Sequence, residues 1–177
     1  MLVSDNEKNL HSSAHLRLCD YLSSKSIVIE PKPLSKEAFL NELILCLCEV
    51  GGLKDVEAVK KAVWDREKEG RTVLENGLAI PHARFEGIQQ LKACLGILPQ
   101  GYEDSQEKLS IKWVFLFLSP QEQFRNHLQM LACISKVFQD KSLMDGLLRA
   151  NTPKEAFELI QYKEKSEFSL LKNLVKK

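Results

Sequence analysis

The segment from Trp113 to Leu118 constrains the fold of this chain most, because every residue in it is apolar. With Ile111 just before it, the segment is typical of a central strand that is buried on both faces of a sheet. It is far too short to cross a bilayer as a helix. A strand of this kind needs helices over both faces of its sheet, so we expect an α/β fold.

Further segments are expected to form strands beside it. Ser26 to Glu30 is rich in β-branched residues and is followed by prolines. Ala93 to Leu98 is a second apolar run. A short strand is expected within Thr72 to Pro81, after a turn at Asn76-Gly77, a dipeptide typical of tight turns.

Helices are expected where capping residues precede apolar residues at helical spacing. One helix is predicted from Ser35 to Gly51-Gly52, and another after Asp55. Two segments have the form of a capping box with proline at the first helical position, and each is expected to start a helix. These segments are Ser119 to Glu122, followed by inward-facing Leu128, Leu131, Ile134 and Phe138, and Thr152 to Glu155; Leu143 to Leu148 indicates one more helix.

The length of 177 residues suits one compact domain, and 44% apolar with 28% charged residues is ordinary for a globular protein. This composition excludes a disordered chain, a collagen-like fibre and a membrane-inserted protein. We predict a single α/β domain over residues 16–162, a mixed β-sheet sandwiched by helices on both faces. The polar residues 1–15 are expected to be a flexible tail, and the charged residues 163–177 a C-terminal tail.

Charge and cysteine content limit the partners and the compartment. The chain has 25 Lys and Arg against 24 Asp and Glu, a net charge of +1, which argues against a nucleic-acid-binding protein. It has an odd number of cysteines, 5, and no apolar leader, so we expect reduced core cysteines in the cytoplasm. Cys46 and Cys48 would point in different directions on a helix, so a metal site or a redox role is not favoured and no cofactor is predicted.

Two of the 4 histidines deserve a functional hypothesis. His82 follows Pro81 at the end of a predicted strand, where proline is expected to stop the pairing and where α/β proteins bind ligands. The alternative is a loop histidine without a role. His127 lies on the apolar stripe of its helix, so it is either a satisfied core histidine, which its spacing favours, or a residue of the site.

Arg66 falls on the inward face of the second predicted helix, in line with Val59 and Val63. An arginine there either faces an anion or neutralises the dipole at the helix end. Glu67 and Glu69 fall on other faces and are expected to be solvated. The chain contains no GxGxxG, GxxxxGK[ST], HExxH, GxSxG or CxxC motif, so these nucleotide, zinc and hydrolase sites are not supported.

The segment from Arg66 to His82 resembles the signature of the mannitol/fructose-type enzyme IIA domains of the bacterial phosphoenolpyruvate-dependent phosphotransferase system (PTS EIIA type-2). It contains Arg-Glu, a threonine after a short spacer, and Gly-Leu-Ala-Ile-Pro-His. A second family element, a helix with His-Leu and a leucine three residues on, is matched by His127, Leu128 and Leu131. The resemblance extends over residues 18–162 and implies the same sheet between helices that the residue patterns predict.

The resemblance implies a role for each matching residue. His82 is expected to carry a phosphoryl group on Nε2, Arg66 to contact it, and His127 to support the phosphate without accepting it. Thr72 is expected to lie near the phosphate. Histidine suits this task because its neutral ring is a nucleophile near pH 7 and also a fair leaving group.

This chain departs from the family pattern around His82. Val73 and Glu75 stand where many members have glycine, and Ala83 stands where they have glycine or cysteine. A loop with fewer glycines is less free to adopt positive φ. Glu75 and Glu86 also add negative charge near the expected anion. We expect these changes to affect donor preference and loop shape more than the chemistry.

The resemblance implies a histidine phosphocarrier that accepts its phosphoryl group from an HPr-type carrier protein. The length leaves no room for a fused IIB, IIC or DNA-binding domain, so we expect a free-standing regulatory IIA of the nitrogen-related branch that binds target proteins. The alternatives are a stand-alone sugar-transport IIA that passes phosphate to a IIB cysteine, and a binding module that is never phosphorylated. Metal-dependent hydrolysis is the least favoured alternative.

Overall fold

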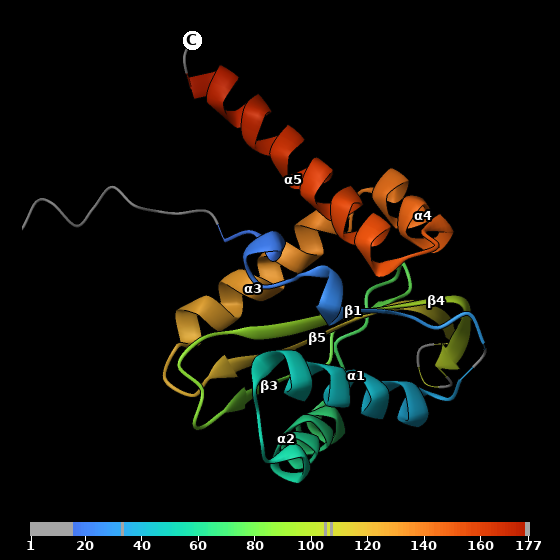
Figure 1. Ribbon diagram of the computed structural model, residues 1–177, viewed down its shortest axis with the longest axis vertical. Helices are drawn as coiled ribbons and strands as arrows, with labels where there is room; N and C mark the ends of the chain where they lie inside the picture. Colours follow the sequence, from blue (N-terminus) through green and yellow to red (C-terminus); the bar gives the residue numbers. More distant parts are fainter. Residues whose placement is uncertain (1–15, 33, 105, 107, 176–177) are drawn as a thin grey trace, which may run out of the picture.

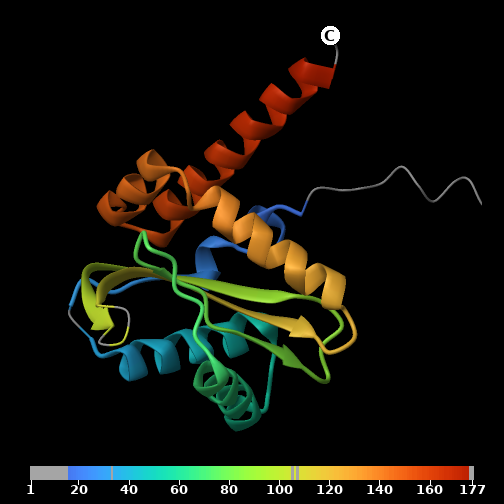
Figure 2. The same cartoon turned by 180° about the vertical axis from the view of Figure 1, so that it is seen from behind.

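A computed structural model describes residues 16–32, 34–104, 106 and 108–175 and shows a β-sheet between two layers of helices (Figure 1, Figure 2). One layer consists of α1 (Lys36–Gly51) and α2 (Val56–Glu69). The other consists of α3 (Phe124–Val137), α4 (Lys141–Arg149) and α5 (Pro153–Val175). The short 3-10 helices η1 (Leu18–Asp20) and η2 (Ser24–Ser26) precede the first strand.

The strands lie in the order β1-β4-β5-β2, and β3 also pairs with β5. Their bounds are β1 (Ile27–Ile29), β2 (Leu78–Ala79), β3 (His82–Phe85), β4 (Lys92–Asp104) and β5 (Leu109–Pro120). The long strands β4 and β5 are antiparallel, whereas β1 is parallel to β4, and β2 and β3 are parallel to β5. The prediction of a mixed sheet sandwiched by helices is therefore confirmed.

β5 is the central strand that its sequence predicts. Trp113, Phe115 and Phe117 pack in the core beneath α3, α4 and α5. Val114 and Leu116 pack in the opposite core with α1 and α2. Alternate side chains of a strand point to opposite faces, so a strand in the middle layer must be apolar throughout.

Most predicted helix ends are confirmed, because local hydrogen bonds define them. The side chains of Ser35 and Asp55 accept hydrogen bonds from backbone N–H groups in the first turns of α1 and α2. Gly52 ends α1 with φ of 66°, a conformation that favours glycine. The Thr152 hydroxyl accepts from the Glu155 N–H at 3.2 Å, and α5 begins at Pro153 as predicted.

The predicted capping box at Ser119 to Glu122 is wrong. β5 continues through Pro120, since Ser119 and Pro120 pair with the last residues of β3. α3 begins only at Phe124, and its N-cap residue makes no side-chain capping bond. Leu128 does not face the core as predicted, and 50% of the residue is exposed, because the buried face of α3 consists of His127, Met130, Ile134 and Val137.

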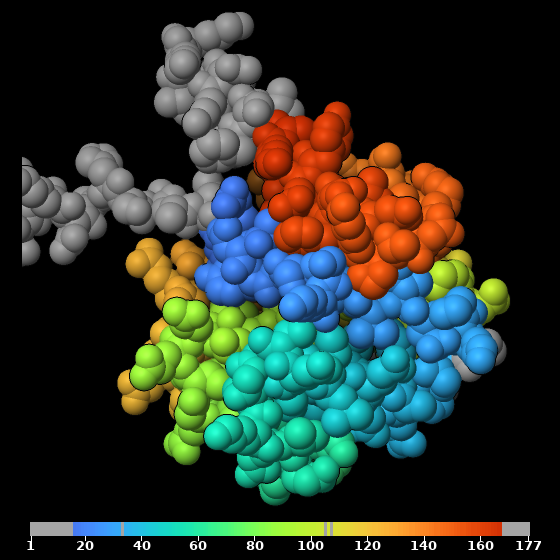
Figure 3. Space-filling model, viewed as in Figure 1, coloured from blue at the N-terminus to red at the C-terminus, as the bar shows by residue number. Residues whose placement is uncertain are grey.

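α5 runs to Val175 and so crosses the predicted boundary at residue 163 without interruption. The buried Glu164 carboxylate accepts hydrogen bonds from the backbone N–H groups of Leu18 (2.6 Å) and Cys19 (3.1 Å). Figure 3 shows this blue N-terminal segment lying between the helices of the two layers. The division into a domain and a tail at 163 stays a prediction, and residues 1–15 lie outside the described residues. No helix within the described ranges is both long and apolar enough to cross a membrane.

Candidate functional site

The candidate site lies at the edge of the sheet formed by β2 and β3, between α2 on one face and α3 on the other (Figure 1, Figure 2). Pro81 interrupts this edge but does not end it, which corrects the prediction. The Pro81 carbonyl accepts a hydrogen bond from the Phe117 N–H at 3.2 Å, and β3 resumes the pairing at His82. A proline removes a donor from the ladder but keeps its acceptor. His82 therefore sits inside a paired edge rather than in a loop.

The His82 ring is buried, with 4% of the residue exposed, and both of its nitrogens have neighbours. Nδ1 lies 2.7 Å from the carbonyl oxygen of Ile80. A carbonyl can only accept, so Nδ1 carries the proton and the neutral ring keeps its lone pair on Nε2. Nε2 faces Arg66 Nη2 at 3.4 Å. Burial, and then the Arg66 charge, lower the pKa of His82, although the bond to Ile80 opposes them.

His127 projects from α3 toward His82, with ring centroids 5.1 Å apart and planes at 61°. Phe117 lies beside both rings and stacks on His82 at 5.3 Å. His127 Nδ1 lies 2.7 Å from Ser119 Oγ. Burial and, after it, the nearby charges of His82, Arg84 and Arg66 lower the pKa of His127 to about 4, so this ring is neutral at pH 7.

Arg66 lies in the last turn of α2 and makes both contacts that its position predicts, one at the helix end and one at the candidate site. Its Nη1 donates to the Gly70 carbonyl at the helix end, as expected of a residue that offsets the helix dipole. Its Nη2 reaches the His82 ring, as expected of a residue that faces an anion. The guanidinium is thus anchored on one side and free to donate on the other.

Thr72 is linked to the His82 ring only indirectly, through Ile80. Its carbonyl accepts from the Ile80 N–H at 2.8 Å, and Ile80 is the residue that holds His82 Nδ1. No hydrogen bond joins the Thr72 hydroxyl to His82 among the residues that the structure describes. Thr72 therefore supports the site through the backbone in this structure.

The departures from the family pattern cause no backbone strain. Val73 forms an isolated bridge with Ala79 and packs against the core beneath α1 and α2. Lys108 is the non-glycine residue with positive φ in the described part of the chain, so Val73 and Glu75 both adopt ordinary conformations. Gly77, with φ of 85°, supplies the left-handed conformation that this turn needs.

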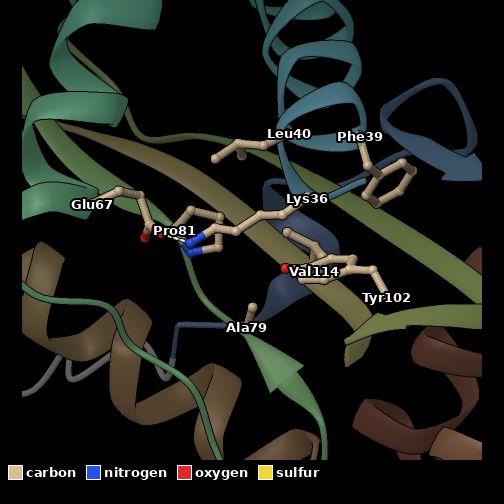
Figure 4. A pocket seen from close by; sticks show the side chains of 8 residues that line it. All are labelled: Lys36, Phe39, Leu40, Glu67, Ala79, Pro81, Tyr102 and Val114. Atoms are coloured by element: carbon tan, nitrogen blue, oxygen red, sulfur yellow. Dashed lines mark hydrogen bonds and ion pairs between the residues drawn. The ribbon is translucent and has the colours of Figure 1, made fainter. Parts of the chain in front are cut away.

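Glu67 is not solvated, which corrects the prediction for this residue. Its side chain, only 9% exposed, pairs with Lys36 at 2.7 Å, and both residues line a small cavity together with Pro81 (Figure 4). The cavity holds about 10 Å³, room for about one water molecule. The paired lysine neutralises an acidic group close to His82, which would otherwise repel an anion there.

Two further residues, Arg84 and Ser119, lie at the site and are not among the residues that the sequence predicts there. Arg84 stands two residues after His82 in β3 and therefore on the same face. It donates to the Gln121 carbonyl at 3.3 Å, and its guanidinium lies 5.9 Å from the Phe124 ring. The strand period of two would have found Arg84 once β3 was recognised. The local sequence predicts a helix cap at Ser119, whereas the structure places it in β5, where its hydroxyl reaches His127.

The arrangement suits transfer of an anionic group better than metal chemistry. The buried His82 imidazole offers one lone pair, and the Arg66 guanidinium and a second neutral imidazole, His127, lie beside it. No cluster of three or more His, Cys, Asp or Glu residues suited to a metal ion occurs among the described residues. A nucleophilic nitrogen beside a fixed guanidinium suits transfer of a phosphoryl group.

Comparisons of the sequence and the fold with known proteins identify the family of this chain. The sequence profile described as "Phosphoenolpyruvate-dependent sugar phosphotransferase system, EIIA 2" matches residues 20–163. The fructose-specific EIIABC component of Bacillus subtilis is 23% identical over 85% of this chain, and the match spans only 24% of that protein's length. The nitrogen regulatory protein of Bradyrhizobium diazoefficiens is 28% identical over 73% of this chain and 85% of its own length. The crystal structure of the nitrogen regulatory protein IIA-Ntr from Neisseria meningitidis superposes with a TM-score of 0.72 at 25% identity, covering 81% of this chain and 98% of that one. The chain therefore belongs to the EIIA type-2 family of the phosphoenolpyruvate-dependent sugar phosphotransferase system, whose members are phosphotransfer components.

Proposed function

We propose that the protein is a histidine phosphocarrier that accepts a phosphoryl group from an HPr-type protein on Nε2 of His82. The observation that carries this proposal is the pair of contacts made by the His82 ring. Nδ1–H is held by the Ile80 carbonyl at 2.7 Å, and the remaining lone pair points toward the Arg66 guanidinium. The nucleophile is therefore in the reactive tautomer before the donor arrives.

In the proposed step, the Nε2 lone pair forms a bond to phosphorus while the phosphorus–nitrogen bond of the donor's phosphohistidine breaks. The electron pair of that bond stays on the donor's ring nitrogen. The His82 ring gains positive charge as the bond forms, which strengthens its hydrogen bond to Ile80. Arg66 then donates to the phosphoryl oxygens, where negative charge accumulates.

His127 is proposed to donate a further hydrogen bond from Nε2–H to the phosphoryl group. This role requires the Ser119 hydroxyl to donate to His127 Nδ1, which leaves the ring proton on Nε2. The lowered pKa of His127 keeps the ring neutral, so it acts as a donor and does not titrate during transfer. Thr72 and Arg84 lie farther from the reacting nitrogen and are proposed to shape the approach to it.

The surface beside the site suits a protein donor. Phe124 and Leu128 on α3 are 58% and 50% exposed, next to the buried His127. Arg84 lies over Phe124 and adds positive charge. Apolar side chains beside a cationic guanidinium form a typical protein contact surface. We propose that this surface receives the HPr-type donor and, afterwards, the next partner.

The regulatory, nitrogen-related branch is the proposed placement within the family. The nitrogen regulatory relatives are 27–30% identical, against 23% and 26% for the fructose-specific ones, and a IIA-Ntr structure superposes with a TM-score of 0.72. A regulatory carrier acts through its charge, and phosphorylation adds about −1.5 to −2 charges at the site. We propose the cytoplasm as the compartment of this function, because five cysteines, an odd number, fit a reducing environment.

A second candidate function is sugar transport, in which the phosphoryl group passes to a cysteine of a IIB domain. The similarity to a fructose-specific component over most of this chain favours it. The two functions differ in the next acceptor. Phosphorylated protein that transfers its label rapidly to a fructose-type IIB domain would identify a sugar carrier, whereas retention of the label would favour the regulatory branch.

Intact-protein mass spectrometry tests the central proposal. The protein is incubated with phosphoenolpyruvate, enzyme I and an HPr-type carrier, beside a His82→Gln variant. Addition of one acid-labile phosphate to the wild type alone is expected. No addition with any of several carriers would overturn the proposal and favour a binding module that is never phosphorylated. Equal addition of phosphate to His82→Gln would show that a residue other than His82 accepts the phosphoryl group.

A further inference from the structure

We propose that Cys46 and Cys94 form an intramolecular disulfide when the protein meets an oxidising low-molecular-weight disulfide. The two Sγ atoms lie 3.7 Å apart, and Cys94 donates its S–H to Cys46. Cys46 belongs to α1 and Cys94 to β4, so the bond would join a helix to the sheet. This inference concerns thiol chemistry remote from the candidate site and does not depend on the proposed phosphocarrier function.

The proximity of the two thiols is set by backbone packing. A Cβ atom added to Gly96 would overlap the ring of Phe39 and come within 2.9 Å of Leu43, so α1 lies directly on β4 at this point. Cys46 is one helical turn beyond Leu43, and Cys94 is two residues from Gly96 on the same face of the strand. α1 and β4 are therefore also in contact at Cys46 and Cys94.

The remaining distance is small for a disulfide. An S–S bond is about 2.05 Å long, so the sulfur atoms must approach by about 1.6 Å. Cys46 is only partly buried and can supply this motion, whereas Cys94 is fully buried and fixed in the sheet. Rotation of one half-buried side chain is a modest change compared with movement of a helix.

Access makes Cys46 the first thiol to react. The Cys46 Sγ donates to the Lys25 carbonyl at 3.5 Å in a contact that is exposed to solvent. The hydrogen bond from Cys94 also lowers the pKa of the Cys46 thiol, which increases its thiolate fraction. Cys94 is shielded from any reagent, and its contact with Cys46 and its burial raise the pKa of its thiol, so it is the second thiol to react.

The chemistry is an ordinary thiol–disulfide exchange. The Cys46 thiolate attacks one sulfur of the reagent, forms a mixed disulfide and releases one reagent thiolate, which takes up the proton lost by Cys46. Cys94 then loses its proton and attacks the Cys46 sulfur, releasing the second reagent thiol. Two electrons pass from the protein to the reagent, so one disulfide is consumed and two thiols are produced.

Cys48 provides the matched control. It lies on the same helix two residues from Cys46 and is buried in the core beneath α1 and α2. Its direction on the helix differs from that of Cys46. A Cys48→Ser variant should therefore keep the reaction, whereas Cys94→Ala should stop it after the first step.

The experiment treats the full-length reduced protein with oxidised glutathione and follows its intact mass. The wild type and Cys48→Ser are expected to lose the mass of two hydrogens, and non-reducing peptide mapping is expected to join Cys46 to Cys94. Cys94→Ala is expected to retain one glutathionyl group on Cys46. A wild type that only accumulates glutathionyl adducts, or that joins another pair of its cysteines, would overturn the proposal.

Thermal unfolding gives an independent readout that does not require a variant. The bond would close a chain segment of 48 residues, so oxidation should raise the Tm by on the order of 10 °C. Reduction should return the Tm to its starting value. An unchanged or lowered Tm in protein that carries the mapped bond would show that the native packing does not accommodate it.

Discussion

Nδ1 of His82 lies 2.7 Å from the carbonyl oxygen of Ile80, two residues earlier in the chain. A single local hydrogen bond thus fixes the tautomer of the proposed phosphoryl acceptor. Pro81 between them has a fixed φ, which limits how the carbonyl and the ring can move relative to each other. The Ile-Pro-His segment that resembles the family signature therefore also orients Nε2, the proposed acceptor nitrogen.

Arg66→Ala is expected to slow phosphorylation of His82 by about 10- to 150-fold. The lost hydrogen bond between guanidinium and phosphoryl oxygen is charge-assisted and contributes about 1.5–3 kcal/mol. Rapid-quench measurement of the transfer rate from the phosphorylated HPr-type donor checks this. Lys68→Ala is the control, because Lys68 lies near the same helix end, is exposed and pairs with Asp65 instead. Equal slowing of both variants would assign the effect to general charge rather than to Arg66.

Ser119→Ala is expected to slow transfer by about 2- to 10-fold, less than His127→Ala. The hydroxyl positions His127 through Nδ1 and does not itself reach the phosphoryl group, so its loss costs one neutral hydrogen bond of about 0.5–1.5 kcal/mol. Ser119→Thr keeps the hydroxyl and should recover part of the rate. The ring nitrogen shifts of His127 in NMR spectra should also show loss of the single tautomer in Ser119→Ala. An unchanged tautomer would contradict the positioning role.

The free energy of unfolding is expected to fall as pH decreases from about 6.5 toward 4. The pKa of His127 is lowered to about 4 in the folded protein, whereas the unfolded chain titrates near 6.5. In this window the unfolded state binds a proton that the folded state does not, so acid favours unfolding. Across this window His127 lowers the free energy of unfolding by up to about 3 kcal/mol, and the full decrease is reached below pH 4.

Urea unfolding of the wild type and His127→Gln over this pH range measures that contribution. Carboxylates also titrate toward pH 4, so the difference between the two proteins is the quantity of interest. The difference should grow in favour of the variant as the pH falls. Parallel pH profiles would show that His127 is not the group responsible.

Gly96→Ala is expected to destabilise the fold by about 1–3 kcal/mol, because the new methyl group would overlap Phe39 in α1. Gly146→Ala is the matched control. Its Cβ would meet only the flexible end of Leu159 at 3.4 Å, within a helix that prefers alanine. Denaturant midpoints with unchanged slopes measure both effects. A Gly96→Ala protein as stable as the wild type would show that α1 can move away from β4.

Much of the fold and of the proposed site follows from short stretches of sequence. The apolar residues around Phe115 predict a strand buried on both faces, and Ser35, Asp55 and Thr152 predict helix starts through bonds made within one turn. The resemblance of their motifs to the family signature predicts His82, Arg66 and His127 as site residues, and the structure brings these three side chains together. The strand and the helix starts depend on neighbours a few residues away, so they can be predicted from local sequence.

The tertiary structure decided what depends on distant partners. Pairing of β3 with β5 carried β5 through Pro120, so Ser119 became a partner of His127 instead of a helix cap. Glu67 pairs with Lys36 of α1, and Cys46 contacts Cys94 of β4. Neither contact can be predicted from the spacing of residues along the sequence. The physical reason is that a side chain's surroundings are set by which elements pack together, and that packing is settled over the whole core at once.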